Sequence, residues 1–157
     1  MLNALLPRSI DNAYRGRKPA LWLLALVVFA KVGISLQSIF NGYRAAASGD
    51  GIPLDTLGAA GAQAVVTLFA LWGVAHLALC LLCILALVRY RAMVPLMFAL
   101  LLLEQLGRKL VLQFLPIVQT ETPLGYAINL TLLALMLVGL ALSLWRREVP
   151  SVPEEAR

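Results

Sequence analysis

The sequence predicts an all-α integral membrane protein, a bundle of four transmembrane helices with both termini in the cytoplasm. Hydrophobic residues make up 61% of its 157 residues and charged residues 13%, whereas a soluble domain carries about 25% charge. A bilayer core of roughly 30 Å needs about 20 apolar helical residues. Four apolar stretches of that length fill most of the chain, and we expect the spans at residues 20–40, 62–88, 93–115 and 124–145.

Residues 1–19 form a basic leader whose leucines and Ile10 fall near one helical face. Two interpretations stay open for it, a short helix lying in the membrane interface and a frayed terminus. A cleaved signal peptide is a weaker alternative, because the small-residue site at 45–47 lies far beyond the end of the first apolar run.

The connections between the spans differ in character. Residues 41–61 contain five glycines and Pro53, which predicts a loop. Residues 89–91 form a tight basic turn, and residues 119–123 a short polar loop. The tail, residues 146–157, is polar and contains prolines, so we expect it to be disordered in the cytoplasm.

Basic residues near the ends of the spans predict the orientation, since cytoplasmic loops carry an excess of Lys and Arg. With the N-terminus inside, the outer connections hold Arg44 alone. The inner segments hold nine basic residues: Arg8, Arg15, Arg17, Lys18, Arg89, Arg91, Arg146, Arg147 and Arg157. The bias predicts a multi-pass membrane protein with both termini in the cytoplasm.

Ionisable residues on three different spans fall at one depth. At about 1.5 Å per residue from the cytoplasmic end, Lys31, His76 and Glu104 each lie about 17–18 Å along their helices. Charges in hydrocarbon are costly, at about 2.5–3.5 kcal/mol each, and usually face the bundle interior. The sequence therefore predicts an ion pair between Lys31 and Glu104 near the midplane, with His76 as a titrating neighbour.

Further polar residues lie about one turn outward from this level. The third span has two polar stripes at four-residue spacing, one from Glu104 to Arg108 and one through Gln105, Lys109 and Gln113. We expect both stripes to face the interior, although Arg108 and Lys109 are also near enough to the outer end to snorkel there. The predicted intramembrane polar cluster comprises Lys31, His76, Glu104, Arg108, Lys109, Gln37 and Asn129.

The cluster has a functional and a structural interpretation. It forms either a proton-linked polar site or a satisfied network that sets the helix register. Lys31, Ser35 and Ser38 share one face of the first span, and such serines, with Ser143, are of the kind that bridges membrane helices.

His76, Cys80 and Cys83 also share one helical face, at i, i+4 and i+7. These are suitable metal ligands, but one straight helix cannot surround an ion with all three. Free cysteines usually act as small apolar packing residues. We therefore expect no metal and no cofactor. A haem, metal or CxxC redox protein remains an alternative that an absorption spectrum tests.

Residues 87–114, LVRYRAMVPLMFALLLLEQLGRKLVLQF, carry the most characteristic pattern: an apolar helix, a basic turn and a further apolar helix. In this pattern and in its layout of four spans the chain resembles small four-helix inner-membrane proteins of bacteria and is similar to the DoxX-like group. The resemblance covers the second and third spans and implies the fold, but no functional residue.

Two functions of different classes follow. The chain has no phosphate-binding glycine loop, H-E-x-x-H or G-x-S-x-G motif, so we expect a non-enzymatic scaffold or accessory subunit of a membrane complex. The alternative is a small proton- or ion-coupled transporter that uses the polar cluster, with a homo-oligomer as its working form. Its partners are the lipid bilayer and other membrane chains rather than nucleic acid, since the basic residues flank apolar runs.

Overall fold

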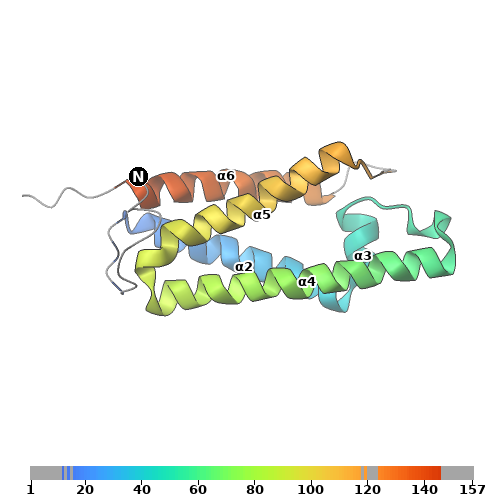
Figure 1. The fold of residues 1–157 in the computed structure, drawn as a ribbon, viewed down its shortest axis with the longest axis horizontal. Coiled ribbons are helices and arrows are strands. Elements are labelled where there is room, and N and C mark those ends of the chain that lie inside the picture. The colour runs from blue at the N-terminus through green and yellow to red at the C-terminus, as the bar shows by residue number, and fades with distance from the viewer. Residues whose placement is uncertain (1–11, 13, 15, 118, 120–123, 146–157) are drawn as a thin grey trace, which may run out of the picture.

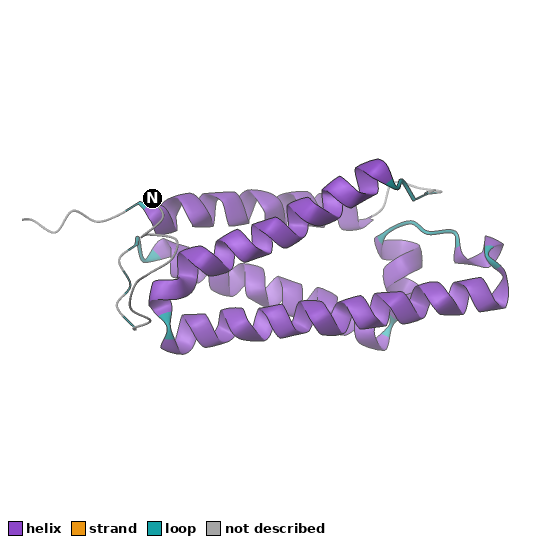
Figure 2. Ribbon diagram, in the orientation of Figure 1, coloured by secondary structure: helices purple, strands orange, loops and turns teal. Residues whose placement is uncertain are grey.

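Four long helices form the protein, which we describe from a computed structural model covering residues 12, 14, 16–117, 119 and 124–145. Figures 1 and 2 show these helices packed along one long axis, with no strand among the described residues. The predicted all-α class is confirmed. The long helices are α2 (Pro19–Phe40), α4 (Gly58–Arg89), α5 (Val94–Phe114) and α6 (Leu124–Leu144).

Successive long helices run in opposite directions (Figure 1), so the start of α2 and the end of α6 lie at the same end of the bundle. Contacts hold these two ends together. The backbone N–H of Arg17 donates to the carbonyl of Leu142 at 3.3 Å, and the Arg17 guanidinium lies 4.3 Å from the ring centroid of Trp145.

Three of the helices, α2, α4 and α6 from Gly125 onward, are long and apolar enough to cross a membrane. Helix α5 has the same length as α6, 21 residues, but Glu104, Arg108 and Lys109 make it more polar. The outward-facing side chains of the bundle are large and apolar, as expected for a lipid-facing surface; examples are Trp22, Phe29, Phe40, Leu68, Leu103 and Phe114.

The prediction of a loop over residues 41–61 is wrong in part. The segment forms α3 (Gly42–Arg44), a π-helical turn (Ala45–Gly49) and a 3₁₀ turn (Leu54–Thr56), and α4 already begins at Gly58. Gly51 and Gly58 adopt positive φ angles of 69° and 66°, which glycine tolerates best. Three consecutive alanines, residues 45–47, lie in the π-helical turn, and alanine favours helix. The glycines therefore do not make the whole segment a loop.

This segment packs against the bundle rather than extending from it. Ala46, Ile52 and Leu54 are buried in a small apolar cluster that also includes Val65 and Phe69 of α4. The segment therefore covers the end of the bundle opposite the α2 start, and it forms one wall of the cavity described below.

The main core lies between the four long helices. Its fully buried side chains include Leu24 of α2, Phe98 and Leu101 of α5, and Met136 of α6. Cys80 and Cys83 of α4 also belong to this core and are wholly inaccessible, as expected for cysteines that act as small packing residues. A short 3₁₀ turn, Arg91–Met93, links α4 to α5.

Predictions for the leader before Asn12, for most of the 119–123 loop and for the tail at 146–157 lie outside the described residues. These predictions are the interfacial helix or frayed terminus, the short loop and the disordered tail.

Helices α2 and α4 approach each other closely at Gly73. A Cβ atom added there would lie 2.9 Å from the carbonyl oxygen of Ser35 and 3.0 Å from side-chain atoms of Ser38 and Ile39. Since one of these atoms belongs to the backbone, no rotamer change relieves the contact. Gly73 therefore sets how closely the two helices pack.

We predict that Gly73→Ala destabilises the protein by about 1–3 kcal/mol, because overpacking forces the two backbones apart. Gly107→Ala on α5 is the matched control. A Cβ there meets nothing within 4 Å, so the helix propensity of alanine should leave stability unchanged or raise it by about 0.5–1 kcal/mol. Unfolding in detergent followed by circular dichroism measures both; equal effects of the two variants would contradict the close approach.

Candidate functional site

Lys31, His76 and Glu104 meet in the interior, each from a different helix. The ammonium of Lys31 lies 3.1 Å from Oε2 of Glu104, and the side chains of Lys31 and His76 are only 3% and 2% exposed. The carboxylate is 22% exposed. Three positions that sequence reasoning placed at one depth thus lie in contact, on α2, α4 and α5.

The Lys31 ammonium has an acceptor for each of its three protons. Nζ donates to Oε2 of Glu104 at 3.1 Å, to Oε1 of Gln105 at 3.3 Å and to Nε2 of His76 at 3.4 Å. An unpaired ammonium in an apolar interior is very costly, whereas one with all its protons donated is tolerated. The three acceptors come from α4 and α5, so one side chain of α2 joins three helices.

The contact with Lys31 constrains the His76 ring. An ammonium has no lone pair, so Nε2 of His76 can only accept in this contact, which leaves Nδ1 as the nitrogen that carries a proton. Nδ1 lies 3.6 Å from Oε1 of Glu104, too far for a hydrogen bond, and it has no other partner among the described residues. The ring also contacts Trp72, with centroids 5.0 Å apart. A small movement of either side chain would close the Nδ1–carboxylate contact.

Gln105 extends the network to the fourth helix. Its side-chain Nε2 donates to Oδ1 of Asn129 at 3.3 Å and to the Asn129 carbonyl at 3.4 Å, while its Oε1 accepts from Lys31. Gln105 is 2% exposed and is the residue that the predicted cluster lacked. The sequence showed that Gln105 belongs to a polar stripe, but the predicted cluster was selected mainly by charge, and Gln105 is neutral.

The serine hydroxyls on the buried face of α2 donate to carbonyls of their own helix. Ser35 donates to the carbonyl of Lys31 at 2.8 Å and Ser38 to that of Ile34 at 3.0 Å, both within α2. Ser143 likewise bonds the carbonyl of Leu140 in its own helix. Hydroxyls that bond back to the preceding turn need no partner on another helix.

The other predicted cluster residues lie apart from the ion pair. Arg108 is half-buried one turn along α5 from Glu104, with its guanidinium carbon 5.3 Å from the Trp72 ring centroid. Lys109 is half-buried and joins neither the network nor the cavity. The stripe prediction is wrong for Gln113, which is exposed, because the end of α5 lies away from the bundle and all residues from 110 to 117 are exposed.

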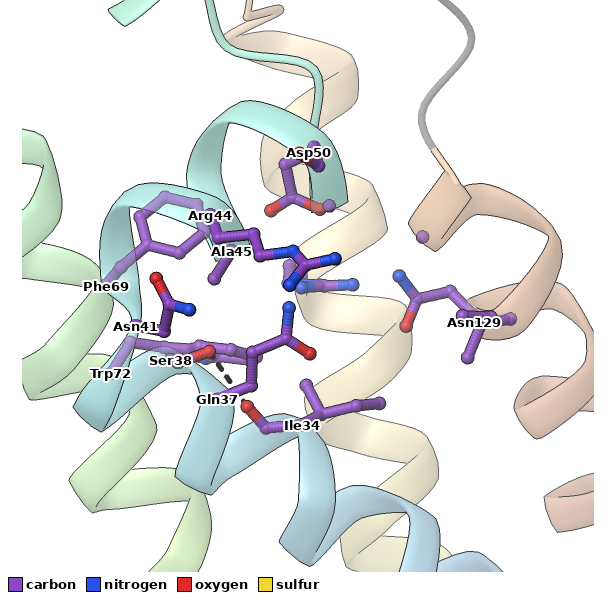
Figure 3. Close-up of a pocket in the computed structure, with 15 residues that line it drawn as sticks. Ile34, Gln37, Ser38, Asn41, Arg44, Ala45, Asp50, Phe69, Trp72 and Asn129 are labelled. Carbon is purple, nitrogen blue, oxygen red and sulfur yellow. Dashed lines mark hydrogen bonds between the residues drawn. The ribbon is translucent and has the colours of Figure 1, made fainter.

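A cavity of about 520 Å³ lies beside Arg108, at the end of the bundle covered by residues 41–57. Gln37 of α2, Arg44 and Asp50 of the covering segment, and Asn129 of α6 line it with Arg108. Figure 3 shows the guanidinium of Arg44 between the carboxylate of Asp50 and the amide of Gln37, pointing toward Asn129. Apolar walls come from Ile34, Phe69, Trp72 and Ile128.

Asp50 is the acidic member of the cavity lining. Burial raises the pKa of its carboxyl above the ordinary value of 3.8, and the positive charge of Arg108 opposes this rise. Asp50 makes no ion pair within 4.0 Å in the part of the chain that the structure describes. Its carboxylate and the two guanidiniums therefore face a common space without neutralising one another by direct contact.

The sequence leaves a metal site at His76, Cys80 and Cys83 as an alternative. Across residues 16–117 and 124–145, no three His, Cys, Asp or Glu side chains lie in an arrangement that could hold a metal ion. Both thiols pack in the apolar core, and His76 is engaged by Lys31.

Comparison with known proteins adds no relative. The chain matches no protein-family model, no curated protein and no solved structure. The resemblance to the DoxX-like group accordingly stays a prediction.

The arrangement is a buried ion pair within a hydrogen-bonded network that links four helices, next to a polar cavity. Removal of the cation alone would leave a carboxylate and a glutamine oxygen without their donor. Removal of both charges would leave neutral groups that cost less to bury. The effects on stability of removing the charge at position 31 and the charge at position 104 should therefore not be additive.

We predict that Lys31→Met destabilises the protein by about 2–4 kcal/mol, somewhat less than for a wholly buried pair because Glu104 retains some exposure. The double variant Lys31→Met/Glu104→Gln should be more stable than the sum of the two single effects by about 1–3 kcal/mol. Unfolding in detergent measures all three variants. Lys109→Met, which removes a lysine outside the network, should change stability by less than about 0.5 kcal/mol; additive effects at positions 31 and 104 would contradict the pairing.

Proposed function

We propose that this chain is a non-enzymatic multi-pass membrane protein, a scaffold or accessory subunit of a larger membrane complex, in which the Lys31 network fixes the register of the helices. The observation that carries this proposal is the saturation of the Lys31 ammonium by acceptors on α4 and α5. A group that must bind and release an ion during a cycle needs a free or exchangeable ligand position. A fully donated ammonium instead favours a fixed structural role.

The proposed topology has four spans, with α5 as the third, and both termini in the cytoplasm of a bacterial cell. The contact between Arg17 and the end of α6 supports placing both termini on one side. Internal neutralisation of Glu104 by Lys31 supports α5 as a span despite its charges. The excess of basic residues near this end supports its cytoplasmic placement.

The alternative is a small proton- or ion-coupled transporter, and one observation favours it. The polar cavity is lined by Trp72 and Arg108, one helical turn from His76 and Glu104 respectively. Asn129 lines the cavity and also bonds Gln105 of the network. In this alternative Glu104 would accept a proton or cation, with Lys31 as its counter-ion and His76 as the pH-sensitive neighbour.

Flux measurements separate the two functions. We predict that the wild-type protein in vesicles moves protons no faster than protein-free vesicles when a pH gradient is imposed and an internal dye reports the pH. Glu104→Gln should lower the stability without changing this rate. A proton flux greater than that of the empty vesicles would contradict the scaffold. It would establish the transporter if Glu104→Gln abolishes this flux and Lys109→Gln retains it.

The scaffold proposal also predicts a partner. After mild detergent extraction from native membranes, the protein should run as a particle heavier than the 17.0 kDa chain, with a second polypeptide or a second copy in a fixed ratio. Lys31→Met should reduce the yield of this particle. Recovery of wild-type protein as a lone chain in several mild detergents would contradict the proposal.

A further inference from the structure

Two arginines from distant parts of the chain line the cavity at the end of the bundle. Arg44 comes from the segment that covers the bundle and Arg108 from α5. Neither guanidinium lies within 4.0 Å of a carboxylate in the described part of the chain. The guanidinium carbon of Arg108 lies 5.3 Å from the Trp72 ring centroid. Among the described residues, no carboxylate occupies the N–H donors of either guanidinium.

We propose that this cavity binds a small organic anion through a carboxylate or phosphate group held by Arg44 and Arg108. Guanidinium groups match the geometry of both anions through paired N–H donors. The side-chain amides of Gln37, Asn41 and Asn129 add neutral donors around the same space.

The remaining walls define the class of ligand more closely. Phe69, Trp72 and the isoleucines at 34 and 128 are apolar, so the ligand carries an apolar portion beside its anionic group. A volume of about 520 Å³ lies in the range of small-molecule sites, which is about 300–1,000 Å³.

Asp50 limits the charge that the cavity accepts. Its carboxylate faces the same space as the two guanidiniums (Figure 3), which leaves one net positive charge in the lining. The lining therefore still favours an anionic group, but less than the two arginines alone would. This balance also makes Asp50 a residue whose removal should strengthen anion binding, the opposite of the effect of removing either arginine.

The cavity lies at the end of the bundle opposite the α2 start, within reach of the membrane surface in the proposed topology. The anionic group therefore belongs either to a dissolved carboxylate or phosphate ester, or to the headgroup of an anionic lipid. Both sources present the same chemistry to Arg44 and Arg108. This inference does not depend on the scaffold or on the transporter.

Trp72 provides a reporter of binding. The protein has three tryptophans, and replacing Trp22 and Trp145 by Phe leaves Trp72 alone, in contact with Arg108. An anion that draws the guanidinium away from the ring should change the Trp72 emission. Titration in lipid-free detergent uses phenyl phosphate and benzoate as probes, and native mass spectrometry measures retention of phosphatidylglycerol against phosphatidylcholine.

We expect saturable binding of at least one anionic probe, weakened about tenfold or more by Arg108→Gln and by Arg44→Gln. Asp50→Asn should tighten it severalfold. Lys109→Gln is the matched control, since it removes an equal charge from the next residue of α5 outside the cavity, and it should change affinity less than twofold. Arg44 is exposed, so its variant should fold even if Arg108→Gln does not.

Each outcome decides the proposal. Arginine-dependent binding of phenyl phosphate or benzoate supports a dissolved ligand, and arginine-dependent retention of phosphatidylglycerol alone supports a lipid headgroup. Lack of saturable binding in both experiments overturns the proposal. Binding that Lys109→Gln weakens as much as the arginine variants do overturns it as well, because it then reflects net charge alone. Weaker anion binding by Asp50→Asn would contradict the assigned role of Asp50.

Discussion

An ammonium group inside an apolar bundle needs an acceptor for each of its protons, and the arrangement of the four helices depends on how Lys31 meets this need. Its three acceptors lie on α4 and α5, and Gln105 extends the connection to Asn129 on α6. Apolar side chains in a bilayer give little preference for one helix register over another, since lipid is as apolar as they are. The polar network supplies a directional preference that the core lacks.

The network and the close approach at Gly73 act on the same pair of helices. Gly73 brings α4 within contact of the Ser35 carbonyl, one turn from Lys31, and so brings His76 within reach of the ammonium. Ser35 and Ser38 contribute their small size to this approach, while their hydroxyls bond back to α2 itself. Backbone spacing and charge pairing are therefore two parts of one arrangement.

Much of the fold could be predicted from the sequence, because span length and apolarity are set by the bilayer itself. Helix α2 begins one residue before the start of its expected span, and α6 ends one residue before the end of its expected span. Because a helix rises by a constant amount per residue, counting residues from the end of each span placed Lys31, His76 and Glu104 at the same depth. The prediction left Gln105 out of the polar network because it selected mainly charged residues, whereas the network includes the residues on the face of α5 that turns inward. The cavity was not predictable, since its wall is a segment whose glycines indicated a loop but whose alanines form helical turns.

The central claim is that Lys31 and Glu104 form a direct ion pair within the bundle, and a distance measurement in lipid tests it. With Lys18 and Lys109 replaced by arginine, Lys31 is the remaining lysine, and solid-state NMR can measure the dipolar coupling between its Nζ and glutamate Cδ atoms in bilayers. The account predicts a coupling that corresponds to about 4 Å and that disappears in Glu104→Gln. Lack of coupling in the folded wild-type protein, or a coupling that survives Glu104→Gln, would contradict it.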